Sequence, residues 1–205
     1  MKKIYKISFL FIFSLGTLLF GTQKCNSQAV EKGNTMVDGY YGFGTLSSAF
    51  LKAISDNSSA KSRIMGPAGI RLDHMMSDKI SLGLDVQYSS GQVTWSEKDS
   101  ANSAITYNYE YNVTRLRFMP RFSIHFGSSD KFDGYFTVSA GYKNVKRSWK
   151  SNDPTYDGNT DLNLVPFAFR LALGGRYFIT DNFGLFMELG VAGGAIIHGG
   201  LSFKF

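Results

Sequence analysis

Residues 163–179 alternate between two kinds of side chain. From Val165 onward the odd positions carry large apolar residues apart from one glycine, while the even positions as far as Arg176 carry Pro, Ala, Gly and two arginines, Arg170 and Arg176. A period of two places these two sets on opposite faces of a β-strand. The stretch therefore predicts a strand with one continuous apolar face and one narrow polar face.

The same period recurs along the rest of the chain and predicts eight strands. They are expected at residues 36–46, 63–75, 79–92, 104–126, 133–148, 163–179, 183–192 and 195–205. Similar turn motifs, SDKI, SDKF and TDNF, place Asp78, Asp130 and Asp181 just before three of these strands. Short connections at these motifs alternate with longer ones, as in an up-and-down barrel that crosses a membrane.

The polar faces distinguish a membrane barrel from a soluble one, because strands alternate in both. A face in contact with water would favour long polar side chains, whereas these faces carry mostly Gly, Ala and Ser with isolated charges. Small residues beside Arg indicate a confined space inside a narrow barrel. We therefore expect an all-β fold, an eight-stranded antiparallel up-and-down transmembrane β-barrel with its apolar face outward.

Aromatic residues near the predicted strand ends indicate where the lipid interfaces lie. This set is Tyr88, Trp95, Tyr142, Trp149, Tyr177 and Phe183. Within residues 107–113 the apolar residues are odd-numbered, whereas from Leu116 onward they are even-numbered. The change predicts either a β-bulge near residues 113–115 or a strand that continues above the membrane under different rules.

The first 29 residues have the features of a signal peptide. Basic residues precede the apolar run 7–20, which is too short for a membrane-spanning helix, and cleavage is expected after Ala29. A lipoprotein anchored at Cys25 is the less favoured alternative because Lys24 precedes the cysteine. The mature domain is then 30–205.

Removal of this segment changes the bulk properties of the chain. Four lysines leave with it and no acid does, so the formal charge falls from +6 to +2. Nucleic acid is therefore not expected as a partner. The single cysteine leaves as well, which excludes disulfides and thiolate metal sites from the mature chain.

Charged residues on the inward face form the candidate site. The bases are Arg71, Arg115, Arg117, Arg121, Lys143, Arg170 and Arg176, and the acids are Asp38, Asp73, Asp85 and Glu188. Counting across the turns places Arg71 opposite or diagonal to Asp85, and Glu188 opposite Gly174 and diagonal to Arg176. We favour an ion-pair network that plugs the barrel, with an anion-preferring pore or ligand site as the alternative.

The histidines give little support to catalysis. His125 has Ser123 on the same face and Asp133 across the turn, whereas His74 and His198 lie in no such pattern. A lone histidine on a strand is more often a hydrogen-bonded or interfacial residue than a catalytic base. We expect no enzyme activity, no cofactor and no metal site.

The signal peptide, the SDK-I/F turns with their alternating strands, the stretch ITDNFGLFMELGVAGG and the terminal Phe205 carry a family resemblance. The chain resembles the small outer-membrane β-barrel family, which includes the OmpA barrel domain and the porin-family outer-membrane β-barrel domains of Bacteroidetes. The resemblance implies insertion by the barrel-assembly machinery, which reads the last strand. It makes Leu201, Phe203 and Phe205 a candidate assembly signal.

These observations predict an integral protein of the bacterial outer membrane with both termini in the periplasm. We expect a monomer surrounded by outer-membrane lipid, with a mainly structural, surface or narrow-pore role. A channel or transporter for small or hydrophobic molecules is the alternative function. A lipid-modifying enzyme is less favoured.

Overall fold

The computed structural model describes residues 28–45, 61–99, 104–126, 129–155 and 166–205, so that most of the predicted signal peptide lies outside the described residues. The strands are β1 (Thr35–Thr45), β2 (Lys61–Ser77), β3 (Ile80–Lys98), β4 (Thr106–Phe126), β5 (Phe132–Ser151), β6 (Phe167–Phe178), β7 (Phe183–Val191) and β8 (Ala195–Lys204). All eight lie where the alternation predicted them. The largest difference is in β3, whose end was predicted at residue 92.

The strands form one closed barrel in sequence order, and every neighbouring pair is antiparallel. The first and last strands pair with each other, with Val37 opposite Phe203 and Gly39 opposite Leu201. The predicted eight-stranded antiparallel up-and-down barrel is therefore confirmed. Among the described residues, no helix has the length and apolar character needed to cross a membrane.

Apolar side chains point out of the barrel and charged ones point in. On β6 and β7, Leu173 and Leu185 keep 54% and 48% of their surface exposed, whereas Arg170 and Arg176 are fully buried. A soluble barrel would show the reverse arrangement. The outward-facing residues form a wide apolar surface that water does not favour.

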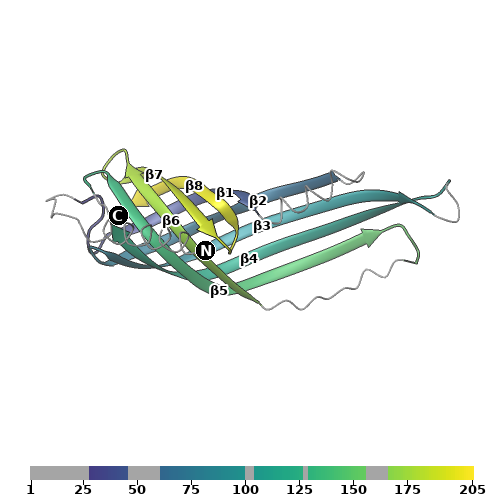
Figure 1. The fold of residues 1–205 in the computed structure, drawn as a ribbon, viewed down its shortest axis with the longest axis horizontal. Coiled ribbons are helices and arrows are strands. Elements are labelled where there is room, and N and C mark those ends of the chain that lie inside the picture. Colours follow the sequence, from purple (N-terminus) through teal and green to yellow (C-terminus); the bar gives the residue numbers. More distant parts are fainter. Residues whose placement is uncertain (1–27, 46–60, 100–103, 127–128, 156–165) are drawn as a thin grey trace, which may run out of the picture.

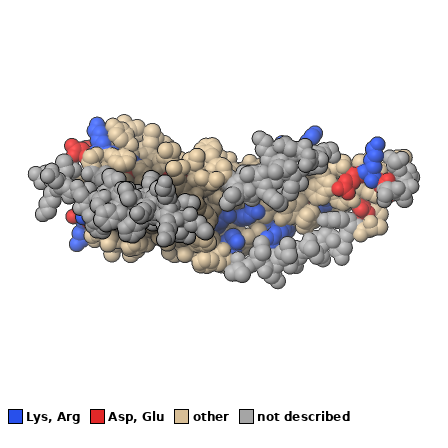
Figure 2. Space-filling model, viewed as in Figure 1, with Lys and Arg blue, Asp and Glu red and all other residues tan. Residues whose placement is uncertain are grey.

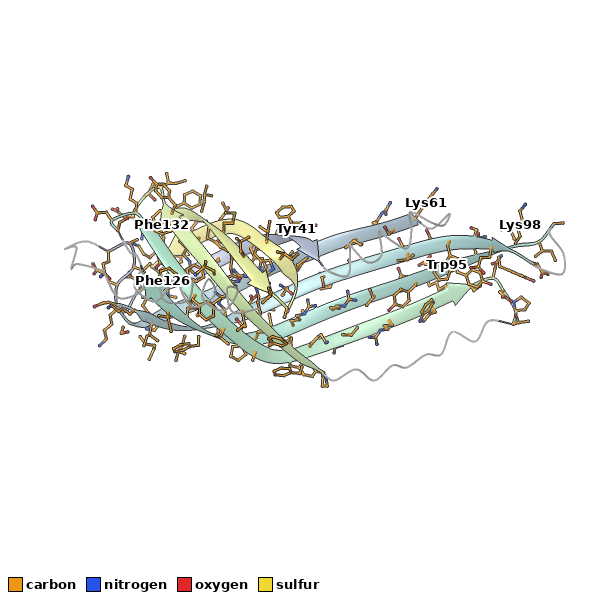
Figure 3. The ribbon with its side chains drawn as sticks, in the orientation of Figure 1. Tyr41, Lys61, Trp95, Lys98, Phe126 and Phe132 are labelled. Carbon is orange, nitrogen blue, oxygen red and sulfur yellow. The ribbon has the colours of Figure 1, made fainter. Side chains whose placement is uncertain are left out.

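Four strands, β2 to β5, continue far beyond the barrel, and the other four do not. The short strands β1, β6, β7 and β8 have 11, 12, 9 and 10 residues, close to the roughly 9–11 that cross a bilayer as a tilted strand. β2 to β5 have 17 to 21 residues and run on together as a four-stranded sheet, which we call the extension (Figure 1). In Figure 3, Tyr41 lies near the end of the barrel and Trp95 lies far out on the extension.

The phase change in residues 107–113 results from the second of the two predicted causes. The register between β3 and β4 is unbroken from Ile80–Ile124 to Lys98–Thr106, so β4 contains no bulge near residues 113–115. The inward face stays the same, but its side chains become aromatic once the strand leaves the barrel. A register shift does occur in β2, between Met65 and Ala68, where Pro67 is tolerated because bulges need no ladder hydrogen bond.

The end with the short turns, here called the turn end, is closed from within. Ala29 and Val30, which precede β1, are buried in one cluster with Met36, Met75 and Phe178. The Lys204 ammonium group donates a 2.7 Å hydrogen bond to the Ala29 carbonyl oxygen. The segment before β1 therefore covers the lumen at this end. Ala29 is the last residue before the predicted cleavage bond, so Val30 is the part of this segment that the predicted mature chain keeps.

Closure by β1 and β8 can be tested with an engineered disulfide. Val37→Cys and Phe203→Cys, combined with Cys25→Ser, place two cysteines at partner positions, where Cα atoms lie about 4.5–5.5 Å apart. This separation suits a disulfide. After oxidation and boiling, we expect a species that migrates faster on a non-reducing gel than on a reducing one.

The matched control is Val37→Cys with Leu201→Cys, in the same Cys25→Ser background. Its positions are offset by two residues and lie about 7–8 Å apart, which is too far for a bridge. Equal crosslinking of both pairs would contradict the register of the closing strands.

Candidate functional site: the charged lumen

Glu188 on β7 is the most heavily paired carboxylate in the lumen. Its oxygens accept hydrogen bonds from Arg71 at 3.0 and 3.1 Å and from Arg170 at 2.9 Å. Arg121 approaches the same carboxylate at 3.4 Å. Three guanidinium groups from three different strands thus share one carboxylate that is fully buried.

Arg71 is also held from its other sides. Its Nε donates to Asp85 at 3.0 Å, and its guanidinium carbon lies 4.1 Å from the centre of the Tyr40 ring. The Tyr40 hydroxyl donates to the same Asp85 at 2.6 Å. The Nη2 atom of Arg71 also contacts the His198 ring nitrogen Nδ1. Arg71 therefore connects β1, β2, β3, β7 and β8 in one network.

A second cluster lies closer to the turn end, around Arg176. This guanidinium group donates to Asp38 at 2.8 Å, to Asp73 at 2.7 Å and to Asp133 at 3.3 Å. Asp73 also accepts a bond from Arg121, which links the two clusters. Among the fully buried charges of the described residues, four guanidinium groups face five carboxylates, so each Arg is neutralised locally.

Small residues make room for these large groups. A Cβ atom added at Gly174 would overlap the Tyr135 ring, and one at Gly190 would overlap the Arg170 guanidinium group. The Tyr135 ring in turn lies under Arg176, 4.4 Å from its guanidinium carbon. The Gly and Ala residues of the inward face therefore leave space that the side chains of arginines and tyrosines on neighbouring strands fill.

The predicted cross-strand positions are correct, but one predicted pair is wrong. Arg71 lies opposite Asp85 and Glu188 lies opposite Gly174. Glu188, however, pairs with Arg71, Arg121 and Arg170 and not with Arg176. The eight-stranded lumen is so narrow that side chains meet across it, and these contacts outcompete the diagonal neighbour on the adjacent strand.

Three predicted members of the network lie outside it. Arg115, Arg117 and Lys143 are on the inward face, but at the level where the barrel gives way to the extension, and they are only partly buried. Arg117 donates a 2.6 Å bond to Gln87. None of the three forms an ion pair with an acid in the described part of the chain. We call these three residues the mouth bases.

His125 lies in an arrangement that resembles a catalytic triad. Its Nε2 is 2.9 Å from the Ser81 hydroxyl, and its Nδ1 is 2.8 Å from Asp133. The sequence pointed to Ser123 as the serine, but Ser123 instead donates to Thr137. The sequence did not point to Ser81 because Ser81 comes from another strand. The Ser81 side chain is fully buried.

The aromatic residues divide into two groups. Tyr88, Tyr142 and Tyr177 are exposed on the outside of the barrel, as a lipid interface requires. Trp95 and Trp149, predicted to belong to the same girdle, lie on the inward face of the extension with their rings 6.2 Å apart. The prediction for these two was wrong because their strands continue beyond the barrel.

The candidate assembly signal lies on the strand that closes the barrel. Leu201 and Phe203 point outward, 44% and 42% exposed, opposite Gly39 and Val37 of β1. Thr35 and Phe205 exchange two 2.9 Å backbone hydrogen bonds. Recognition of these residues by the assembly machinery stays a prediction.

A closed antiparallel barrel with an apolar exterior and an ionised interior is the architecture of β-barrels that span membranes, because hydrocarbon cannot satisfy an open strand edge. This class is the one that the fold and the lumen define. Within it, residues 13–193 match the family model described as MltA-interacting protein MipA. The chain belongs to this outer-membrane protein family. The narrower resemblance to the Bacteroidetes type stays a prediction.

Several solved structures resemble this chain at low sequence identity. The outer membrane protein OprG from Pseudomonas aeruginosa is 11% identical, with a TM-score of 0.48 over 89% of this chain and 99% of that one. The N-terminal β-barrel domain of Pseudomonas aeruginosa OprF is 13% identical, with a TM-score of 0.45 over 86% and 100%. Ail of Yersinia pestis is 13% identical, with a TM-score of 0.33 over 85% and 99%. A comparison with curated protein sequences gave no match.

Replacing Glu188 tests how strongly the lumen depends on it. Glu188→Gln leaves three buried guanidinium groups short of a charge, and loss of one partner from a buried ionic network costs about 3–5 kcal/mol. We expect the free energy of unfolding to fall by that amount, measured by urea unfolding in lipid vesicles with gel mobility as the readout.

Glu110→Gln is the matched control, because Glu110 is partly exposed on the extension and forms no ion pair among the described residues. We expect it to change the free energy of unfolding by less than about 0.5 kcal/mol. Equal effects of the two substitutions would show that the lumen network is not a main source of stability.

Proposed function

We propose that this protein is a plugged outer-membrane barrel with a structural and surface role, and not an open channel. The observation that carries the proposal is the complete burial of Arg71, Arg121, Arg170 and Arg176 against five carboxylates. Ion conduction through a pore needs polar groups that face water. Here the charged groups face one another, which supports a lumen filled by its own side chains.

The extension supports the surface part of the proposal. It raises β2 to β5 roughly 30 Å beyond the barrel, at about 3.3 Å per residue (Figure 1). Its outward face carries Lys146, Lys150 and Glu110, which are suited to water and not to lipid. The proposal places the extension outside the cell and the turn end, with both termini, in the periplasm.

The proposal includes lipid as the neighbour of the apolar exterior, the barrel-assembly machinery as the route of insertion, and a monomeric state. It includes no catalytic step. The triad-like arrangement around His125 supports this view, because Ser81 is fully buried and Asp133 is also paired with Arg176. Because substrate cannot reach Ser81, its hydroxyl group serves to hold the His125 ring in position.

Conductance in planar bilayers tests the plug against the alternative of a channel or transporter. We expect the purified, folded protein to give no steady current. The double variant Arg71→Ser with Glu188→Ser removes one guanidinium group and its carboxylate together and leaves the net charge unchanged. We expect it to give discrete openings. Steady, ion-selective current through the unchanged protein would overturn the plug and favour a channel.

A second candidate function is binding to MltA, and the match to the MipA family favours it. A direct test immobilises the folded protein in nanodiscs and measures binding of purified MltA. We expect saturable binding that empty nanodiscs do not show. Charge reversal at the turn end (Lys79→Glu) and on the extension (Lys150→Glu) would identify the end that binds. Absence of binding to the unchanged protein would remove this candidate.

A further inference from the structure

Among the residues that the structure describes, the level where the barrel gives way to the extension concentrates positive charge without acidic ion-pair partners. Arg117 lies opposite Lys143 across β4 and β5, and Arg115 follows on the same face, opposite Ser89. Figure 2 shows Lys and Arg side chains gathered in a hollow partway along the molecule, while the acidic side chains visible in this view lie toward the two ends. Below this level each of the five buried carboxylates already has an ion-pair partner, and none of those partners is a mouth base.

Arg117 has an unused donor at this level. Its Nη1 donates to Gln87 at 2.6 Å, but its Nε is buried and has no hydrogen-bond partner among the described residues. A buried donor of a charged group without a partner is costly, because the group has lost its water. A water molecule or an anion in the space beside it would supply the missing acceptor.

A small cavity lies beside this group. It has a volume of about 40 Å³, more than one water molecule needs, and is lined by Ser89, Gly91, Val113, Arg115, Arg117 and Gly194, among others. The glycines leave the cavity open toward backbone groups. The polar side chains of this lining are the guanidinium groups of Arg115 and Arg117 and the hydroxyls of Ser89 and Ser90. Lys143 is not part of the lining but lies opposite Arg117 on β5.

Aromatic rings continue the same face above the cavity. Tyr111 and Trp149 lie with ring centres 4.2 Å apart, and Trp95 stacks on Tyr109 at 5.3 Å. These rings are partly exposed on the inward face of the extension. Tyr111 lies four residues from Arg115 on β4, roughly 13 Å along the strand, so one face presents both cationic groups and flat aromatic surfaces to a ligand that has a charge and a ring.

We propose that the mouth of the barrel is a binding site for an oxyanion, a phosphate, sulfate or carboxylate group, carried by a saccharide. Arg115, Arg117 and Lys143 bind the anionic group, since guanidinium groups pair with such oxygens through two parallel bonds. The aromatic cluster above them contacts the sugar ring. The site lies outside the plugged lumen and does not depend on whether the lumen conducts.

Calorimetric titration of the folded, full-length protein in detergent at low salt tests the site. The probes are glucose 6-phosphate, inorganic phosphate and glucose. We expect glucose 6-phosphate to bind most tightly, inorganic phosphate more weakly and glucose not at all. Equal binding of the two phosphates would support the anion site but assign it to free anions. Failure of both phosphates to bind would overturn the proposal.

Substitutions then locate the binding. Arg115→Gln and Lys143→Gln each remove a charged donor from a partly exposed position, so we expect each to weaken glucose 6-phosphate binding at least about ten-fold. Arg117→Lys keeps the charge but removes the Nε donor, and we expect a smaller loss. Heat-dependent migration on a gel checks that each variant is folded.

Lys146→Gln is the matched control. Lys146 lies on β5 beside these residues and carries the same charge, but it is exposed on the outward face. We expect the affinity of the Lys146→Gln variant for glucose 6-phosphate to equal that of the unchanged protein. If Lys146→Gln weakened binding as much as Lys143→Gln, the attraction would come from overall charge, and the proposed site would be wrong.

Discussion

A charge inside a protein must find a partner, and this requirement determines the interior of the barrel. Glu188 is stable in the narrow lumen because three guanidinium groups surround it, and each of them is stable because it pairs with a carboxylate in turn. Removing one member leaves several others unpaired. The glycines and alanines of the inward face follow from the same requirement, because larger residues would keep the paired groups apart.

The alternation of residue types predicts most of the fold, because a strand in a closed membrane barrel has only two environments. Counting across a short turn also locates Arg71 opposite Asp85, since neighbouring strands share a fixed register. The partners of Glu188 could not be found in this way. Arg71 and Glu188 come from strands far apart in sequence order, and only closure of the sheet brings them together.

The alternation of residue types also could not predict the level along the strands at which the outward face stops facing lipid. Trp95, Trp149 and the mouth bases lie on strands whose register continues without interruption, so the backbone pairing does not mark the change of surroundings. The signal that did exist was chemical. In residues 107–113 the outward face carries Asn108, Glu110 and Asn112, which are side chains that lipid does not favour.

The unequal strand lengths also determine how deep the protein lies in the bilayer. Above Ala68 on β2 and Tyr142 on β5, no described strand pairs with the outer edge of either strand. Backbone groups at such an edge need water or another partner, which hydrocarbon cannot provide. The hydrocarbon layer must therefore end near the level of Ala68 and Tyr142. The free edges act as a depth limit that would oppose sliding of the barrel toward the turn side of the membrane.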